Sequence, residues 1–179
     1  MPTEPVQLMS VGAYLEFEER SSERHEYVDG IVYVLPGETL RHNRVAGNLY
    51  TQLLPGADKK GYAVTLVGIK LFIPALNRFY YPDVMVLCDP QNADDTVFEY
   101  PCFIAEVLSP STEATDRREK LQAYRTIETL QGYLMLDPKE NAAEYVVRTP
   151  QGWQSRRLAE GSIEIGCLGL SLELPALFA

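Results

Sequence analysis

Two short apolar runs, each interrupted by one carboxylate, constrain the fold of this chain more than any other feature. The first covers residues 82–87 (Pro-Asp-Val-Met-Val-Leu) and the second covers residues 102–108 (Cys-Phe-Ile-Ala-Glu-Val-Leu). Runs of about four to eight residues rich in Val, Ile, Leu and Phe are typical of buried strands, because a helix needs greater length and a period of about 3.6 residues. We therefore predict two interior strands that carry Asp83 and Glu106.

A charge at either of these two positions is costly, because a buried carboxylate without a partner loses its hydration and gains little in return. Asp83 is near the start of its run and Glu106 is near the end of the next, so antiparallel pairing would bring both to one end of a sheet. Together with the backbone carbonyl of Val107, they would supply the oxygen ligands that Mg²⁺ prefers. The alternative is structural, with Asp83 in a turn and Glu106 bonded to a loop amide.

A helix is predicted over residues 116–127, with Ser111 or Thr115 as its N-cap. The apolar residues of this helix share one face, and Lys120 borders that face. The flexible stem of Lys120 could therefore reach back over the strand ends and place an ammonium beside the two carboxylates. The alternative is a solvated lysine that pairs with Asp116, one turn earlier.

The motifs around these residues resemble a known family. Pro82-Asp83, then Glu106, then a lysine is similar to the PD-(D/E)XK nuclease superfamily, and more narrowly the chain resembles the Uma-two family, whose members are classed as restriction endonucleases. One position departs from the superfamily pattern, because Leu108 stands where the lysine usually follows the glutamate. By resemblance, Lys120 takes the role of that lysine. The motifs that carry the narrower resemblance are Arg24 to Gly30, Tyr81 to Val84, Ile104 to Thr112 and Asp116 to Tyr124.

The resemblance implies a restriction-endonuclease-like core, in which a mixed central β-sheet is flanked by helices and extended by extra N- and C-terminal strands. It also implies that Glu26 joins the active site from outside the central strands, as a further ligand to the metal or to water. The alternative for Glu26 is a charge at a strand edge that faces water. The implied activity is hydrolysis of phosphodiester bonds of nucleic acid, with DNA as the expected substrate and Mg²⁺ or Mn²⁺ as the cofactor.

The pattern along the rest of the chain predicts an α/β (α+β) domain with a mixed sheet. Asp29-Gly30 predicts a hairpin, because a tight two-residue turn requires positive φ angles. A first helix is predicted at residues 11–20, capped by Ser10, with Glu18 on its polar side. Further strands are predicted at residues 62–66, 70–74, 79–81, 132–138, 143–148, 153–158, 162–165 and 170–174.

A second helix is predicted at residues 40–54, ended by Pro55-Gly56, and His42 lies in its first turn. A helix N-terminus disfavours the imidazolium, so a neutral His42 could accept a proton or form a hydrogen bond to a phosphate near the site. The alternative is a surface or capping histidine.

Composition limits the class of protein. The chain has 179 residues, of which 46% are apolar and 23% charged, which fits one domain over residues 1–179. We expect a cytoplasmic protein without contact to a membrane, because no run of about 18 apolar residues and no leader pattern is found. Cys88, Cys102 and Cys167 show no CxxC spacing, so buried free thiols are expected.

The net charge of −9 argues against a protein that coats nucleic acid by bulk attraction. It leaves two alternatives to a nuclease: a non-catalytic binding or assembly module, or a metal-dependent hydrolase of another substrate. A homodimer is expected, because restriction enzymes make two cuts. Basic residues that could form a local patch for DNA, or else a solvated face, are Arg41, Arg44, Arg117, Arg118, Lys120 and Arg125.

Overall fold

The computed structural model describes residues 8–88 and 96–179. The helical elements are α1 (Val11–Arg20), α2 (Leu40–Lys60), the 3₁₀ turn η1 (Pro74–Leu76), α3 (Glu113–Thr115), the π-helical turn η2 (Asp116–Lys120), α4 (Leu121–Tyr124) and α5 (Leu174–Leu177). The strands are β1 (His25–Val28), β2 (Ile31–Val34), β3 (Ala63–Leu66), β4 (Lys70–Ile73), β5 (Arg78–Tyr80), β6 (Val84–Leu87), β7 (Val97–Phe98), β8 (Pro101–Val107), β9 (Gly132–Asp137), β10 (Ala142–Thr149), β11 (Gly152–Leu158), β12 (Ser162–Ile165) and β13 (Leu170–Glu173).

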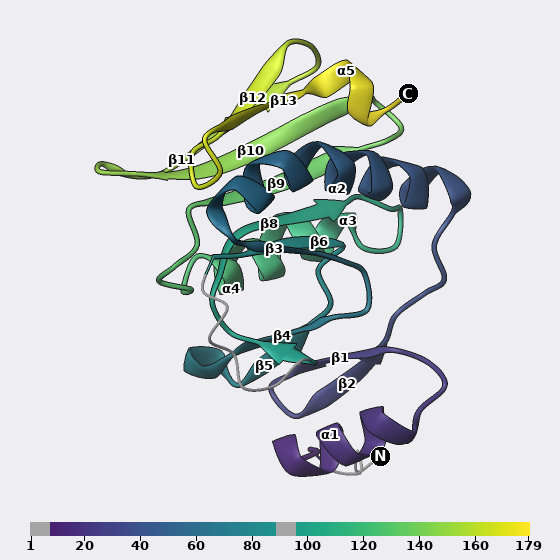
Figure 1. Cartoon of the computed structure of the whole chain (residues 1–179). Coiled ribbons are helices and arrows are strands. Elements are labelled where there is room, and N and C mark those ends of the chain that lie inside the picture. Colours follow the sequence, from purple (N-terminus) through teal and green to yellow (C-terminus); the bar gives the residue numbers. More distant parts are fainter. Residues whose placement is uncertain (1–7, 89–95) are drawn as a thin grey trace.

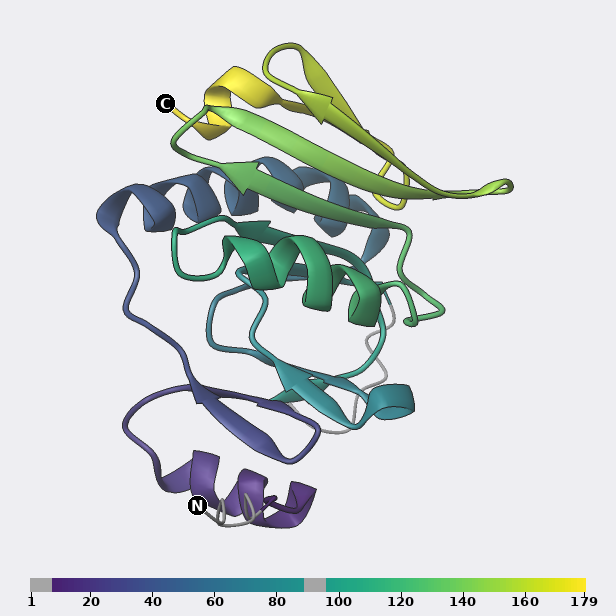
Figure 2. The same cartoon turned by 180° about the vertical axis from the view of Figure 1, so that it is seen from behind.

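The central sheet has the strand order β11-β10-β9-β8-β6-β3. Strands β8 and β9 are parallel, whereas β6 and β8 are antiparallel, so the sheet is mixed as predicted. Helix α2 covers one face of this sheet, and the helical segment formed by α3, η2 and α4 lies on the other face (Figures 1 and 2). Both faces are therefore buried, which explains why β6 and β8 read as continuous apolar runs.

A second sheet, with the order β2-β1-β5-β4-β7, lies on the N-terminal side of the molecule with α1 packed beneath it (Figure 1). Its core is aromatic: Tyr14 of α1 packs against Tyr27 and Phe79, with ring centroids 5.0 and 5.1 Å away. The hairpin predicted around Asp29-Gly30 is confirmed, and both residues have positive φ angles. This sheet delivers β1, and with it Glu26, to the edge of the central core.

The prediction that α2 ends at Pro55 is wrong. The helix runs to Lys60 and is capped by Gly61 in the left-handed conformation, with a φ of 69°. Proline inside a helix removes one backbone hydrogen bond and costs about 3 kcal/mol. Burial of Leu53, Gly56 and Ala57 against the core offsets this cost, and a Cβ on Gly56 would collide with the C-terminal hairpin. Tertiary packing therefore outweighs the local helix-breaking signal.

The helix that carries Lys120 begins at Glu113, earlier than predicted, and its N-cap is Thr112 rather than Ser111 or Thr115. The backbone N–H of Glu113 donates to the carbonyl of Ser109 over 2.9 Å. Within this helix, η2 has π-helical geometry. Such widened turns are frequent at functional sites, and both of its buried residues carry a charge.

Cys88 and Cys102 form a disulfide, so the expectation of free thiols is wrong for this pair. Cys88 follows β6 and Cys102 lies in β8, and the antiparallel pairing of these strands brings the two Cα atoms to 5.7 Å. The two cysteines are 14 residues apart in sequence, so a search for CxxC spacing does not detect the pair. Cys167 is a buried free thiol, as expected.

The predicted strands from β3 to β5 and from β9 to β13 are confirmed, whereas β7 was not predicted. Part of the connection between β6 and β8 lies outside the described residues. Within residues 8–88 and 96–179, no helix has the length and apolarity needed to cross a bilayer.

Candidate active site

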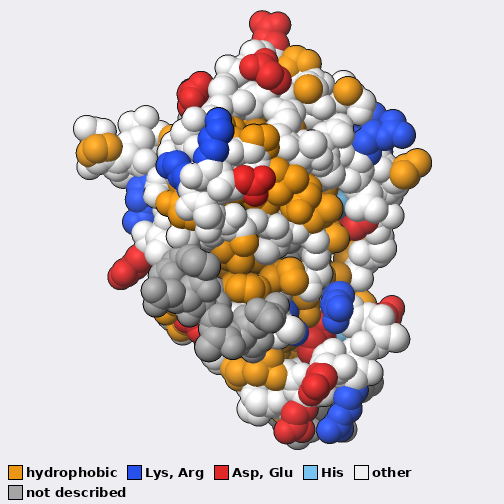
Figure 3. Space-filling view, viewed as in Figure 1, with side chains coloured by type: hydrophobic (Ala, Val, Ile, Leu, Met, Phe, Trp, Pro, Cys, Tyr) orange, Lys and Arg blue, Asp and Glu red, His pale blue; other side chains and the backbone are white. Residues whose placement is uncertain are grey.

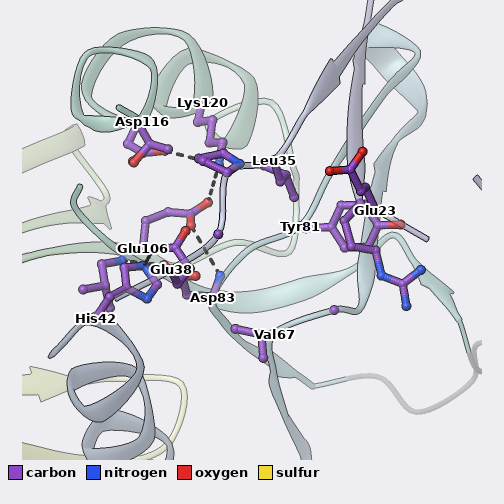
Figure 4. A pocket seen from close by; sticks show the side chains of 16 residues that line it. Glu23, Leu35, Glu38, His42, Val67, Tyr81, Asp83, Glu106, Asp116 and Lys120 are labelled. Carbon is purple, nitrogen blue, oxygen red and sulfur yellow. Dashed lines mark hydrogen bonds and ion pairs between the residues drawn. The ribbon is translucent and has the colours of Figure 1, made fainter. Parts of the chain in front are cut away.

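Asp83 and Glu106 meet at one end of the central sheet. Val84 of β6 pairs with Ala105 of β8 in the antiparallel register, so the residues that flank this pair, Asp83 and Glu106, face each other. The N–H of Asp83 lies 3.3 Å from Glu106 Oε2, and the N–H of Val107 donates to Asp83 Oδ2 over 2.7 Å (Figure 4). The backbone of each strand thus holds the carboxylate of the other.

Lys120 lies at the centre of an acidic cluster. Its Nζ is 2.9 Å from Glu26 Oε1, 3.1 Å from Glu106 Oε1 and 3.2 Å from Asp116 Oδ1. The three carboxylates come from β1, β8 and the first residue of η2, and Lys120 is only 4% exposed. The pairing with Asp116 is present as in the alternative interpretation, but Lys120 is buried rather than solvated and also reaches the strand carboxylates.

Tyr124, one turn after Lys120, also belongs to this cluster. Its hydroxyl donates to Glu106 Oε1 over 2.8 Å, so that oxygen accepts from both Tyr124 and Lys120. Tyr124 is fully buried against Tyr80 and Tyr133. It fixes the Glu106 carboxylate by a hydrogen bond and by packing.

His42 approaches the site from the N-terminus of α2. Its Nε2 is 3.1 Å from Asp83 Oδ2 and 3.3 Å from Glu38 Oε2. The Thr39 side chain accepts from the N–H of His42 over 3.1 Å and so begins the helix at this point. His42 is 4% exposed and is therefore not the surface histidine of the alternative interpretation.

These groups surround a cavity of about 350 Å³ that opens between the two sheets and the N-terminus of α2 (Figure 4). The side chains that line it come from separate parts of the chain: Glu23, Arg24, Leu35, Pro36, Glu38, His42, Val67, Tyr81, Asp83, Glu106, Val107, Thr112, Asp116 and Lys120. The two strand carboxylates and Lys120 therefore line the same cavity.

Burial raises the pKa of Glu106 well above its ordinary value; the Lys120 ammonium opposes this shift, and Asp116, Asp83 and Glu26 add to it. Burial lowers the pKa of Lys120, but the charges of Glu106, Glu26 and Asp116 outweigh it and raise that pKa well above its ordinary value. The site therefore favours the neutral form of Glu106 while it holds the lysine as an ammonium.

The surroundings of His42 favour the imidazolium more than the sequence suggested. Burial lowers the pKa of His42, but the hydrogen bond and charge of Asp83 and the charge of Glu38 outweigh burial and raise it. The two carboxylates in contact with the ring thus have more effect on the pKa of His42 than the helix N-terminus, which was the influence expected from the sequence.

The donor set has the ligand chemistry of a hard-cation site. Among the described residues, the carboxylates of Glu26, Glu38, Asp83, Glu106 and Asp116 contact only two cationic side chains, Lys120 and His42. Glu26, Asp83, Glu106 and Asp116 are buried residues, so solvent compensates little of the excess negative charge. Carboxylate oxygens, with the backbone of Val107 beside them, are the ligands that Mg²⁺ and Mn²⁺ prefer.

A second buried network supports the site from α1. Glu18, predicted on the polar side of its helix, is instead fully buried and accepts from the backbone and ring nitrogens of His25 and from the Tyr81 hydroxyl, at 2.7 to 3.0 Å. His25 and Tyr81 flank Glu26 and Pro82-Asp83 in sequence. The N–H of Tyr81 also lies 3.5 Å from Glu26 Oε1. Glu18 therefore ties the two segments together.

The structure brings all the predicted site residues, Glu26, His42, Asp83, Glu106, Val107 and Lys120, to the cavity or its acidic cluster. The sequence interpretation missed Glu38 and Glu18. Glu38 could have been found, because it lies one helical turn before His42. No local signal marks Glu18, since its partners are brought to it only by the tertiary fold.

Two of the basic residues predicted as a possible patch for DNA have partners within the protein. Arg117 pairs with Glu113 and Glu144, and Arg41 donates to the carbonyl of Pro138 and to Asn141. On the face shown in Figure 3, Lys and Arg side chains lie in separate groups. Lys120 belongs to the site rather than to the surface, because it is buried.

A family model described as "Putative restriction endonuclease" (Uma2) matches residues 11–176. The chain belongs to the Uma2 family. An uncharacterized protein of Synechocystis sp., slr1290, is 32% identical over 180 residues, which cover 99% of this chain and 95% of the relative. Another Synechocystis protein, sll1609, is 34% identical over 134 residues, which cover 73% of this chain and 75% of the relative.

The fold is that of a solved Uma2-type structure. A crystal structure from Anabaena variabilis, titled as a "putative nuclease belonging to DUF820", matches with a TM-score of 0.78 over 95% of this chain and 97% of that chain. The sequence identity is 15%, so this likeness speaks for the fold. The predicted family and fold class are both confirmed.

Proposed function

We propose that this Uma2 protein is a Mg²⁺- or Mn²⁺-dependent endonuclease that hydrolyses phosphodiester bonds of DNA. One observation carries the proposal: Asp83 and Glu106 share the end of the sheet with Lys120, inside a cavity whose buried carboxylates outnumber its cations. The family description and the nuclease-like fold support the reaction class. Two cuts in a duplex need two such sites, so the proposed active form is a cytoplasmic homodimer.

The contacts of each residue indicate its proposed role in hydrolysis. Asp83, Glu106 and the Val107 carbonyl would hold the cation, with Glu26 within reach of the same cluster. When bound, a divalent cation supplies the polarisation of a phosphate oxygen and lowers the pKa of a water molecule. Lys120, held as an ammonium by three carboxylates, has no free lone pair with which to accept a proton, so its proposed role is to neutralise charge that develops on the phosphate.

The remaining contacts are orienting. His42 Nε2 holds Asp83 Oδ2, and Tyr124 holds Glu106 Oε1, so neither carboxylate can turn freely. His42 Nδ1 is buried without a partner among the described residues. His42 also lines the cavity, which favours it as the second group that contacts substrate.

We expect Asp83→Asn to lower the initial rate of plasmid cleavage in Mn²⁺ by about 100-fold or more, because it removes a charge that the cation needs and keeps the shape of the side chain. The measurement is conversion of supercoiled to nicked and linear DNA at equal protein concentration. The matched control is Asp58→Asn, an exposed aspartate on α2. Cleavage by Asp83→Asn at the parental rate would contradict the proposal.

Mn²⁺ is expected to raise the midpoint temperature of thermal unfolding of the parent protein and to leave that of Asp83→Asn unchanged. At about 100 times the dissociation constant, binding contributes about 2.7 kcal/mol. For a chain of this size, that raises the thermal midpoint by roughly 5–10 °C. The measurement is thermal unfolding by circular dichroism with and without Mn²⁺. If the parent shows no shift up to millimolar Mn²⁺, the metal site is refuted and a non-catalytic binding module becomes the better hypothesis.

A further inference from the structure

Three cysteine sulfurs meet at the opposite end of the central sheet from the carboxylates. Cys88 follows β6, Cys102 is near the start of β8, and Cys167 lies in the turn between β12 and β13. Their Sγ atoms all lie within 4.8 Å of one another. Asp83 and Glu106 lie at the other ends of β6 and β8, so the sulfur cluster is distinct from the candidate active site.

The disulfide between Cys88 and Cys102 does not account for the third sulfur. Cys167 comes from the C-terminal hairpin, far away in sequence, and yet it completes a triangle of sulfur atoms. Cys102 and Cys167 are 1% and 7% exposed, and Cys88 is half-buried. Convergence of three sulfurs from three segments is the arrangement that a thiolate metal site needs.

Backbone N–H groups and the side chain of Lys60 lie near the Cys167 sulfur, but burial has the larger effect on its pKa. Burial raises the pKa of the Cys167 thiol to about 11, whereas the backbone N–H groups of Cys167 and Leu168 and the charge of Lys60 act to lower it. The Lys60 ammonium also donates to the Cys167 carbonyl over 2.9 Å.

The dimensions suit a soft cation. With metal–sulfur distances of about 2.3 Å, three thiolates around one ion lie roughly 4 Å apart. That separation is within the 4.8 Å that encloses the sulfurs here. Opening the disulfide would let Cys88 and Cys102 move apart to this distance. Thiolates select Zn²⁺ and Cu⁺ over Mg²⁺, so this site would not compete for the hard cation of the acidic cluster.

We propose that Cys88, Cys102 and Cys167, in their reduced form, bind one thiophilic cation of the Zn²⁺, Cd²⁺ or Cu⁺ class. A dithiol reductant first gives two electrons and two protons to the Cys88–Cys102 disulfide and itself becomes a disulfide. The cation then displaces one proton from each of the three thiols, and these protons pass to solvent. The oxidised protein keeps one thiol and has no site, so binding depends on the redox state.

The test is a Cd²⁺ titration of the full chain after reduction and removal of metals, followed by the ultraviolet charge-transfer absorbance of cadmium thiolate. The expected result is a band that saturates at one Cd²⁺ per chain and is absent from the oxidised protein. Cys167→Ser is expected to lose about one third of the saturating band, because two thiolates of three remain, and to bind more weakly. Cys88→Ser, at a half-buried position, gives the same test if Cys167→Ser fails to fold.

Asp83→Asn is the control for metal bound at the carboxylates, and its band is expected to equal that of the parent, since carboxylate oxygens give no thiolate band. The proposal is overturned if the reduced parent shows no band, or if the serine variants that fold keep the full band. Loss of cleavage in Asp83→Asn with an unchanged Cd²⁺ band would separate this site from the proposed nuclease activity.

Discussion

Lys120→Met is expected to lower the free energy of unfolding of the metal-free protein by about 3–5 kcal/mol, because removal of one partner leaves buried charge uncompensated. The Lys120 ammonium contacts Glu26, Glu106 and Asp116 within 3.2 Å, and it is 4% exposed. Methionine fills a similar volume, so the loss reports charge rather than a cavity. The measurement is urea denaturation at neutral pH with a chelator present.

The matched control is Lys59→Met, an exposed lysine near the end of α2, which is expected to change stability by less than about 0.5 kcal/mol. A double variant, Lys120→Met with Glu106→Gln, removes one of the carboxylates that lost its partner. It is expected to be more stable than Lys120→Met alone, because the effects of substitutions on the free energy of unfolding are not additive for residues in contact. A loss below about 1 kcal/mol for Lys120→Met, or no recovery in the double variant, would contradict a charge-compensating role for this lysine.

The strands and their carboxylates could be predicted because their signals are local. An apolar run with one acid is unusual enough to mark Asp83 and Glu106, and helical spacing is enough to place Lys120 beside the buried face. The antiparallel register that joins the first two residues follows from the order of the strands. For this reason the sequence alone predicts that the two carboxylates lie together at one end of the sheet.

The errors share one physical cause, which is tertiary packing that overrides a local rule. Pro55 does not end α2, because the helix buries Gly56 and Ala57 against the core on the far side of the proline. Glu18 interrupts no apolar run, so nothing in its neighbourhood predicts burial against His25 and Tyr81. The sulfur cluster likewise depends on a strand register and on a distant hairpin, which spacing along the chain does not encode.

Glu106→Gln is expected to act in opposite directions on stability and on DNA cleavage. Burial raises the pKa of Glu106 well above its ordinary value, so ionised Glu106 destabilises the metal-free protein at neutral pH. A neutral isostere avoids this cost and is expected to raise the free energy of unfolding at pH 7. Cleavage is expected to fall by about 1000-fold, because the variant loses both a proposed metal ligand and the charge that holds Lys120.

The sign of the pH dependence separates this explanation from a simple packing effect. A carboxyl whose pKa is higher in the folded than in the unfolded protein makes the folded state bind more protons, so its contribution to stability falls as pH rises from about 4.3 through the folded pKa. The gain of Glu106→Gln in free energy of unfolding over the parent is therefore expected to be absent near pH 4 and to grow with rising pH. The measurement is urea denaturation with a chelator present. Glu160→Gln, exposed in the turn before β12, is the control and should follow the parent at every pH. If Glu106→Gln is less stable than the parent at all pH values, Glu106 serves the fold as a hydrogen-bond acceptor for Lys120 and Tyr124, and its loss of cleavage would no longer point to metal binding.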